Sequence, residues 1–389
     1  MIPPVIARPV SDKPSWLVAA ENRLPFWICE NEMFRSKVMA LEYATKHNTD
    51  IDLYFNDVEF SALPWTHEPP ESIDYYYAKR ARQLREHYDY IVIMYSGGSD
   101  SSTILKTFVN NGITVDEVAT YGGWSHKVNK YHDPINLEIT FAATGMLKRC
   151  VDMGIKVTYL NMLQHFDKVY DSPNWVYDAD PRLNADNHFK FHTAHQRPEL
   201  IEMIEKGHKV AVIFGHDKPR IVFRDNAFYI SYLDVGALAT NVWPQMFELN
   251  YVGPAMEFFY PNVEVPEIMI KQGHMIMDWY IKNQGAHCRE LLRMDWLYDP
   301  KYQSRVNTIM YPTTWRETET YSIGKPSTTY TWLWKSEFLI DHMQDTRQNQ
   351  NFWDGLSRIK TSIDSRFWGR LGLVGHWTKF YKLREVQDL

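Results

Sequence analysis

The chain has 389 residues, more than the roughly 250–300 that one hydrophobic core usually serves, so we expect two domains or one core with large additions. Hydrophobic residues make up 44% and charged residues 23%, as in soluble globular proteins, and the formal net charge of −6 disfavours nucleic-acid binding through a large basic surface. The three cysteines are too scattered for a disulfide framework or a Cys-x-x-Cys site, which favours a cytoplasmic protein.

The first 88 residues are predicted to form an N-terminal extension. Met1–Pro14 contains no apolar run of signal-peptide length, and nowhere do about 18 apolar residues follow one another, so we expect neither secretion nor a membrane span. The pattern predicts a strand at Trp16–Ala19 and a helix at Phe34–Thr45. The proline-rich residues 63–70 indicate an extended connector, and Ser72 is a predicted cap for a helix with a basic face.

A buried parallel sheet is predicted to begin at Tyr90–Tyr95, a short apolar run rich in β-branched and aromatic residues. Apolar residues at helical spacing follow in Ser102–Asn110. Strand and helix patterns then alternate, which is typical of a parallel α/β sheet. The further predicted strands are Val115–Tyr121, Lys156–Leu160 and Lys209–Phe214, and the further helices are Ile135–Met153 and Arg197–Lys206.

Beyond Asp234 the pattern indicates helices, for example at Glu267–Lys282 and Cys288–Tyr298, followed by a Trp-rich tail. We therefore predict an α/β fold in three regions. These are an N-terminal extension (1–88), a core (89–235) and a mostly helical, Trp-rich C-terminal region (236–389).

A loop rich in serine and glycine joins the first strand of this core to its helix. It reads Ser96-Gly97-Gly98-Ser99-Asp100-Ser101-Ser102. Its two glycines allow close approach of the backbone to a ligand, its hydroxyls can donate to phosphate oxygens, and a helix N-terminus follows directly. The loop lacks the lysine of the Walker A motif and the third glycine of the dinucleotide fingerprint, so P-loop kinases, GTPases and NAD or FAD enzymes are disfavoured.

The string Ser-Gly-Gly-x-Asp-Ser after a buried strand resembles the PP-loop of the ATP pyrophosphatase superfamily, the adenine nucleotide α-hydrolase-like enzymes. The resemblance covers about 140 residues, from Tyr90 to Asp234, and implies a Rossmann-like (HUP/PP-loop) core. It implies ATP and Mg²⁺ as cofactors, with cleavage between the α- and β-phosphates. Residues 96–102 would surround the pyrophosphate, and Asp100 would be both catalytic and the magnesium ligand.

Two further loops are predicted to line the same site, because ligands of open parallel sheets lie beyond the carboxyl ends of the strands. By resemblance, the loop at 121–124 lies near the base, where Trp124 could stack; a plain glycine turn is the alternative. The loop at 214–220 joins a glycine turn to an acid and two cations, and a charged surface turn is its alternative. The predicted nucleotide-binding residues here are Tyr121, Gly122, Gly215, His216 and Asp217, and the predicted catalytic cations are Lys218 and Arg220.

Two other patterns have weaker functional interpretations. His188, His192 and His195 have the spacing of a zinc site on a helix, although their polar surroundings favour an ordinary surface. Basic and aromatic residues alternate between Trp353 and Arg384, a composition that can stack on bases and contact phosphates, although core packing with a solvated rim is the more common outcome.

The predicted function is that of an ATP-dependent ligase or synthetase. It would adenylate a carboxylate or carbonyl oxygen of a small-molecule acceptor, release pyrophosphate, and let an amine or ammonia displace AMP. The sulfur-transfer branches of the superfamily depend on clustered cysteines, whereas Cys29, Cys150 and Cys288 are isolated. The alternatives are an enzyme that amidates or thiolates nucleic-acid bases, using the aromatic-basic tail as its platform, and a non-catalytic ATP-binding module. The acceptor, the nitrogen or sulfur source and the oligomeric state are not identified by the sequence.

Overall fold

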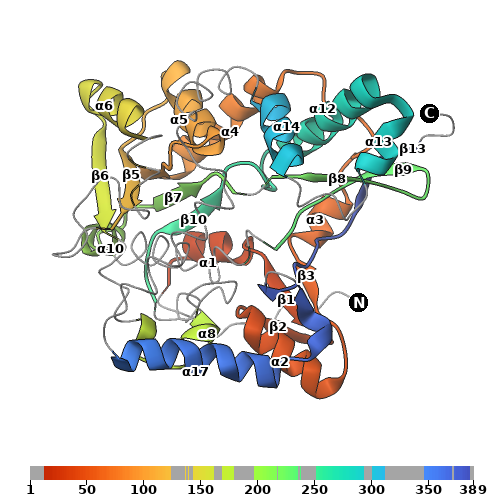
Figure 1. Ribbon diagram of the computed structural model, residues 1–389. Coiled ribbons are helices and arrows are strands. Elements are labelled where there is room, and N and C mark those ends of the chain that lie inside the picture. The colour runs from red at the N-terminus through yellow and green to blue at the C-terminus, as the bar shows by residue number, and fades with distance from the viewer. Residues whose placement is uncertain are drawn as a thin grey trace.

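The computed structural model describes residues 13–123, 136, 139, 143–161, 169–178, 197–216, 218–234, 237, 251–292, 300–311, 346–369 and 372–385. A five-stranded parallel sheet in the order β10-β7-β4-β5-β6 lies at its centre (Figure 1). The strands are β4 (Tyr90–Met94), β5 (Glu117–Gly122), β6 (Lys156–Asn161), β7 (Val210–Phe214) and β10 (Ala255–Phe258).

The middle strands are buried along almost their whole length, because helices cover both faces of the sheet. Every residue of β7 is buried, and in β4 only Tyr90 is partly exposed. The chain passes from β4 to β5 and on to β6 on one side, and then returns to the other side of β4 to form β7 and β10. The direction of winding therefore reverses between β4 and β7.

Helices lie on both sides of this sheet (Figure 1). The helices α4, α5, α12 and α14 lie together on one side, and α1 and α10 lie on the other. Apolar side chains from both groups and from the sheet form one large hydrophobic cluster. The bounds are α1 (Ser15–Asn22), α4 (Ile73–His87), α5 (Ser99–Asn110), α6 (Thr144–Asp152), α10 (Pro198–Glu205), α12 (Glu267–Gln284) and α14 (Pro300–Met310).

A three-stranded antiparallel sheet is formed by the two strands that follow β7 along the chain and by the C-terminal strand. It consists of β8 (Arg220–Arg224), β9 (Ala227–Ser231) and β13 (Tyr381–Glu385) in the order β13-β9-β8. Asp225 and Asn226 have φ angles of 48° and 56°, as a two-residue type I′ hairpin turn requires. The C-terminal strand β13 pairs with β9, the second strand of the hairpin that follows β7.

A second hydrophobic cluster combines elements from both ends of the chain. It packs the N-terminal strands and α2 against α8 and α17, in the lower half of Figure 1. Its elements are β1 (Phe26–Cys29), β2 (Glu32–Phe34), α2 (Lys37–His47), β3 (Asp52–Tyr54), α8 (Trp175–Asp178) and α17 (Thr346–Ser362). The remaining short elements are α3 (Asp57–Ser61), η5 (Gly285–His287), α13 (Cys288–Leu291), η7 (Ser365–Phe367), β11 (Trp368–Gly369) and β12 (Gly372–Leu373).

The predicted α/β class with a parallel sheet is confirmed, and the four strands predicted for it are present. The described part of the C-terminal region is mostly helical, but it also supplies β10, a strand that the helical pattern beyond Asp234 did not indicate. The strand predicted at Trp16–Ala19 is wrong, since these residues belong to α1. The predicted helix from Phe34 begins only at Lys37, because Phe34 ends β2.

The helix predicted at Cys288–Tyr298 is only partly described. Its α13 segment ends at Leu291, and residues 293–299 lie outside the described residues. The division into three regions stays a prediction. Within the described residues, no helix combines the length and the apolar character needed to cross a membrane.

Candidate functional site

The candidate site lies at the carboxyl ends of β4 and β7, where the winding of the parallel sheet reverses. The loops that follow these two strands diverge there, and such a switch point is the usual ligand crevice of an open parallel sheet. The loop after β4 contains residues 95–98 and leads directly into α5, and the loop after β7 contains Gly215, His216 and Lys218. The two predicted loops are therefore neighbours in space.

The backbone of the first loop leaves the N-terminus of α5 available to a ligand. Gly97 has a φ angle of 77°, a left-handed conformation that favours glycine. Gly98 is the N-cap of α5 and supplies no side-chain acceptor. By contrast, Ser72 caps α4 and accepts a hydrogen bond of 3.2 Å from the backbone N–H of Tyr75. The unsatisfied N–H groups of a first helical turn bind anions, so this end of α5 suits a phosphate group.

The hydroxyl groups of the loop hold its shape. The backbone N–H of Ser96 donates to Ser101 Oγ at 3.2 Å, and the two hydroxyls lie 3.3 Å apart. Ser102 Oγ lies 3.2 Å from the hydroxyl of Tyr95, and the Ser99 carbonyl accepts a hydrogen bond of 2.9 Å from Thr103. Ser99 and Ser101 are buried, whereas Ser96, Gly98 and Asp100 are partly exposed. The partly exposed members of the loop are therefore the ones positioned to meet a ligand.

Asp100, in the first turn of α5, is held by groups from three other parts of the chain. The hydroxyl of Tyr311 donates to Oδ1 at 2.6 Å, and Lys218 Nζ lies 2.9 Å from Oδ2. The hydroxyl of Tyr260 donates to the backbone carbonyl of Asp100 at 2.7 Å. Hydrogen bonds to charged groups contribute about 1.5–3 kcal/mol each, so the position of this carboxylate is strongly constrained.

The buried tyrosines near Asp100 keep their hydroxyl protons at neutral pH and can therefore donate hydrogen bonds. Burial, with the nearby charge of Asp100 as the next cause, raises the pKa of Tyr311 well above its usual value. Burial likewise raises the pKa of Tyr260 and of Tyr77, whose ring lies 5.5 Å from that of Tyr260. Gln272 donates to the Tyr77 hydroxyl at 2.9 Å. Buried tyrosines and Gln272 thus form a connected polar group on which Asp100 rests through Tyr260 and Tyr311.

The second loop touches the first at Asp100. A Cβ atom placed on Gly215 would lie 3.0 Å from Asp100 Cβ and 3.3 Å from its carbonyl carbon, so a glycine is needed for this close approach. His216 and Lys218 are partly exposed beside it. Arg220 is buried at the start of β8. Asp217 lies outside the described residues.

The predicted loop near the base is described only at its beginning. Tyr121 and Gly122 end β5, the strand beside β4, with Gly122 buried and Tyr121 partly exposed. Gly123 exchanges two hydrogen bonds with the buried side chain of Asn136, at 2.8 and 2.9 Å, which fixes the backbone at the end of this strand. Trp124 lies outside the described residues.

Of the weaker patterns, only the aromatic-basic tail is described. His188, His192 and His195 lie outside the described residues. In the tail, Arg384 pairs with Asp278 at 2.8 Å, Lys382 pairs with Glu385 at 2.5 Å, and Phe367 is buried. Several of its cations thus have intramolecular partners, as expected for a solvated rim around packed aromatic residues.

Two residues at the site were absent from the sequence prediction. Tyr260 follows β10, so recognising that strand would have indicated it by the rule that ligands lie at carboxyl ends of strands. Tyr311 follows α14, 211 residues from Asp100 along the chain, and no local pattern marks it.

No protein-family model matches the chain, and no curated protein matches it in sequence.

Proposed function

We propose that this chain is a PP-loop ATP pyrophosphatase with a Rossmann-like core. It would adenylate a carboxylate or carbonyl oxygen of a small-molecule acceptor and release pyrophosphate, after which an amine or ammonia displaces AMP. The observation that carries the proposal is the glycine-capped N-terminus of α5 at the switch point of the parallel sheet, with Asp100 and Lys218 in contact beside it.

The strand order supports a Rossmann-like core. Numbered along the chain, the five parallel strands lie in the order 5-4-1-2-3, which read from the other edge is the 3-2-1-4-5 arrangement of doubly wound nucleotide-binding sheets. In such sheets the loop after the first strand receives the phosphates. Here that loop is the one with the Ser-Gly-Gly-x-Asp-Ser string.

The residues fit a bound pyrophosphate and a cation. The first-turn N–H groups of α5 and the hydroxyl of Ser96 would bind the phosphate oxygens. Asp100 would hold Mg²⁺, which would neutralise charge as diphosphate leaves. Lys218 already places an ammonium group 2.9 Å from this carboxylate, so the carboxylate attracts cations at the predicted position. On nucleotide binding Lys218 would turn from Asp100 to a phosphate oxygen and stabilise its negative charge.

The reaction can be tested before the natural acceptor is known. Purified protein would be incubated with ATP, Mg²⁺, pools of carboxylic acids and hydroxylamine, which replaces the amine and traps activated carboxylates as hydroxamates. We expect AMP and pyrophosphate in equal amounts, with hydroxamate formed from one pool. ADP and phosphate as products would reject the proposal, and ATP bound without turnover in every pool would favour a non-catalytic module.

A further inference from the structure

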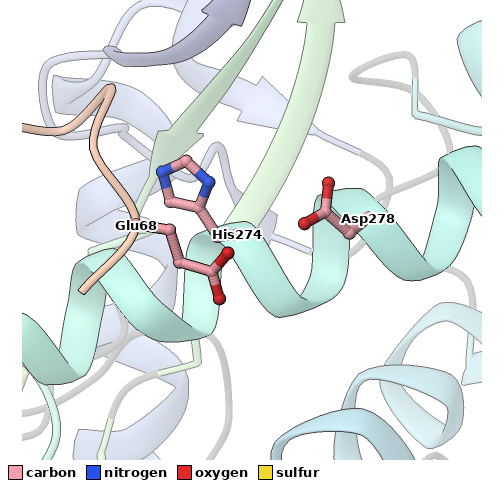
Figure 2. Close-up of side chains that lie close together, drawn as sticks. All are labelled: Glu68, His274 and Asp278. Carbon is pink, nitrogen blue, oxygen red and sulfur yellow. The ribbon is translucent and has the colours of Figure 1, made fainter. Parts of the chain in front are cut away.

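A cluster of three possible metal ligands lies on the long helix α12, away from the nucleotide loop. Figure 2 shows Glu68, His274 and Asp278, whose ligand atoms all lie within 4.8 Å of one another. His274 and Asp278 are one helical turn apart and share one face of α12, whereas Glu68 comes from the proline-rich connector between α3 and α4. The cluster therefore joins two segments that are distant in the sequence.

The imidazole of His274 is oriented with a bare nitrogen toward the carboxylates. Its Nε2 lies 2.9 Å from the carbonyl oxygen of Trp65, and because a carbonyl only accepts, Nε2 must carry the proton. The ring is 2% exposed, and Nδ1 has no hydrogen-bond partner among the described residues. In Figure 2 this second nitrogen lies on the side of the ring that faces Asp278, and the Glu68 carboxylate lies below the ring.

This arrangement leaves three electron-pair donors facing one another. A buried nitrogen without a partner is unfavourable, and carboxylates cannot donate to it. A metal-binding histidine usually donates its other ring N–H to an acceptor that fixes the tautomer, as Nε2 does here to the Trp65 carbonyl. The geometry thus calls for a positive centre between the three side chains.

The carboxylates keep one oxygen available for such a centre. Lys271 contacts Glu68 Oε1 at 2.6 Å, and Arg384 contacts Asp278 Oδ1 at 2.8 Å. These ion pairs are partly exposed, so each is weak, and they hold the carboxylates near the helix face without using their second oxygens.

We propose that Glu68, His274 Nδ1 and Asp278 bind a divalent transition-metal ion, with Zn²⁺ as the best fit. One imidazole and two carboxylates suit zinc better than magnesium or calcium, which prefer oxygen ligands alone. Ligands of tetrahedral zinc at about 2.1 Å are roughly 3.4 Å apart, so ligand atoms that lie up to 4.8 Å apart must approach one another by up to about 1.4 Å. The bound ion would link the proline-rich connector, through Glu68, to α12 and would stabilise their contact.

The test uses the full chain with His188, His192 and His195 replaced by alanine, which removes the other predicted zinc pattern. Zinc titrations by calorimetry would compare this parent with E68Q and D278N. The matched control is E267Q, which removes an ion pair to Lys79 at another position on the same helix. We expect one zinc ion per chain in the parent and in E267Q, and affinity weakened roughly 10–100-fold or more in the other two.

A second measurement separates loss of binding from loss of folding. At one zinc concentration, zinc should raise the midpoint of thermal unfolding of the parent and of E267Q more than that of D278N, while all of them unfold cooperatively without metal. Equal zinc affinity in the parent, E68Q and D278N would overturn the proposal. No zinc binding by the parent would also overturn it.

Discussion

At the scale of single residues, Asp100 is the point where the candidate site is assembled. Its side chain contacts Tyr311 and Lys218, and its backbone carbonyl accepts from Tyr260. We expect Asp100→Asn to lower the rate of pyrophosphate release roughly 100-fold to 1,000-fold, the range for losing one charge-stabilising group. Asp354→Asn, an exposed change on α17, is the control. A wild-type rate in Asp100→Asn, measured by a coupled pyrophosphate assay, would remove this residue from the chemistry.

Tyr311 is expected to act as a positioning residue through its hydrogen bond to Asp100. In Tyr311→Phe we expect kcat to fall about tenfold with little change in KM for ATP, and the free energy of unfolding to fall by about 1.5–3 kcal/mol. The matched control is Tyr381→Phe, because that buried hydroxyl has no hydrogen-bond partner among the described residues. Equal effects of the two variants on kcat would show that the hydrogen bond to Asp100 has no catalytic role.

At the scale of elements, the loop after β7 can contact the first turn of α5 only because residue 215 is a glycine and has no side chain. A Cβ on Gly215 would crowd Asp100 at 3.0 Å, so Gly215→Ala must push the two elements apart. We expect a loss of about 1–3 kcal/mol in stability and weaker ATP binding, measured by denaturant unfolding and calorimetry. ATP affinity equal to that of the wild type would show that the two loops do not act together.

The sequence predicted elements best where the pattern was local. The run Tyr90–Tyr95, the glycine loop and the following helix lie next to one another, and all appear in order. The apolar and aromatic residues of Trp16–Ala19 suggested a strand, but Leu17, Ala20 and Glu21 face the core at helical spacing, and only the continuation past Ala19 reveals this. β10 was missed because four residues at the edge of a sheet give too short a pattern to separate from a helix.

The contacts that complete the site could not be predicted, because they join residues far apart in the chain. Lys218 was predicted for the site from its position after a strand, and the structure places it against Asp100. Tyr260 and Tyr311 approach the same residue only because the fold brings the ends of β10 and α14 to the first turn of α5. No single sequence shows such packing.

At the scale of the whole molecule, buried tyrosines should make the fold sensitive to alkali. Burial raises the pKa values of Tyr77, Tyr260 and Tyr311, so these groups keep their protons in the folded state when the unfolded chain loses them near pH 10. Their contribution to stability is complete below about pH 10 and is lost as pH rises, by about 1.4 kcal/mol per pH unit for each tyrosine.

Denaturant unfolding between about pH 9 and pH 11.5 measures this slope. Tyr260→Phe should reduce it by about 1.4 kcal/mol per pH unit, since one titrating group is removed. A free energy of unfolding that stays constant above about pH 10 would show that these hydroxyls are not buried in the folded protein.

The central claim is that this molecule cleaves ATP between the α- and β-phosphates, and two ATP analogues test it most directly. The trapping reaction with hydroxylamine would be run with β,γ-methylene-ATP, in which the α,β bridge is intact, and with α,β-methylene-ATP, in which that bridge cannot be hydrolysed. The proposed chemistry predicts AMP from the first analogue and no turnover of the second. Turnover of α,β-methylene-ATP with release of phosphate, and none of β,γ-methylene-ATP, would contradict it.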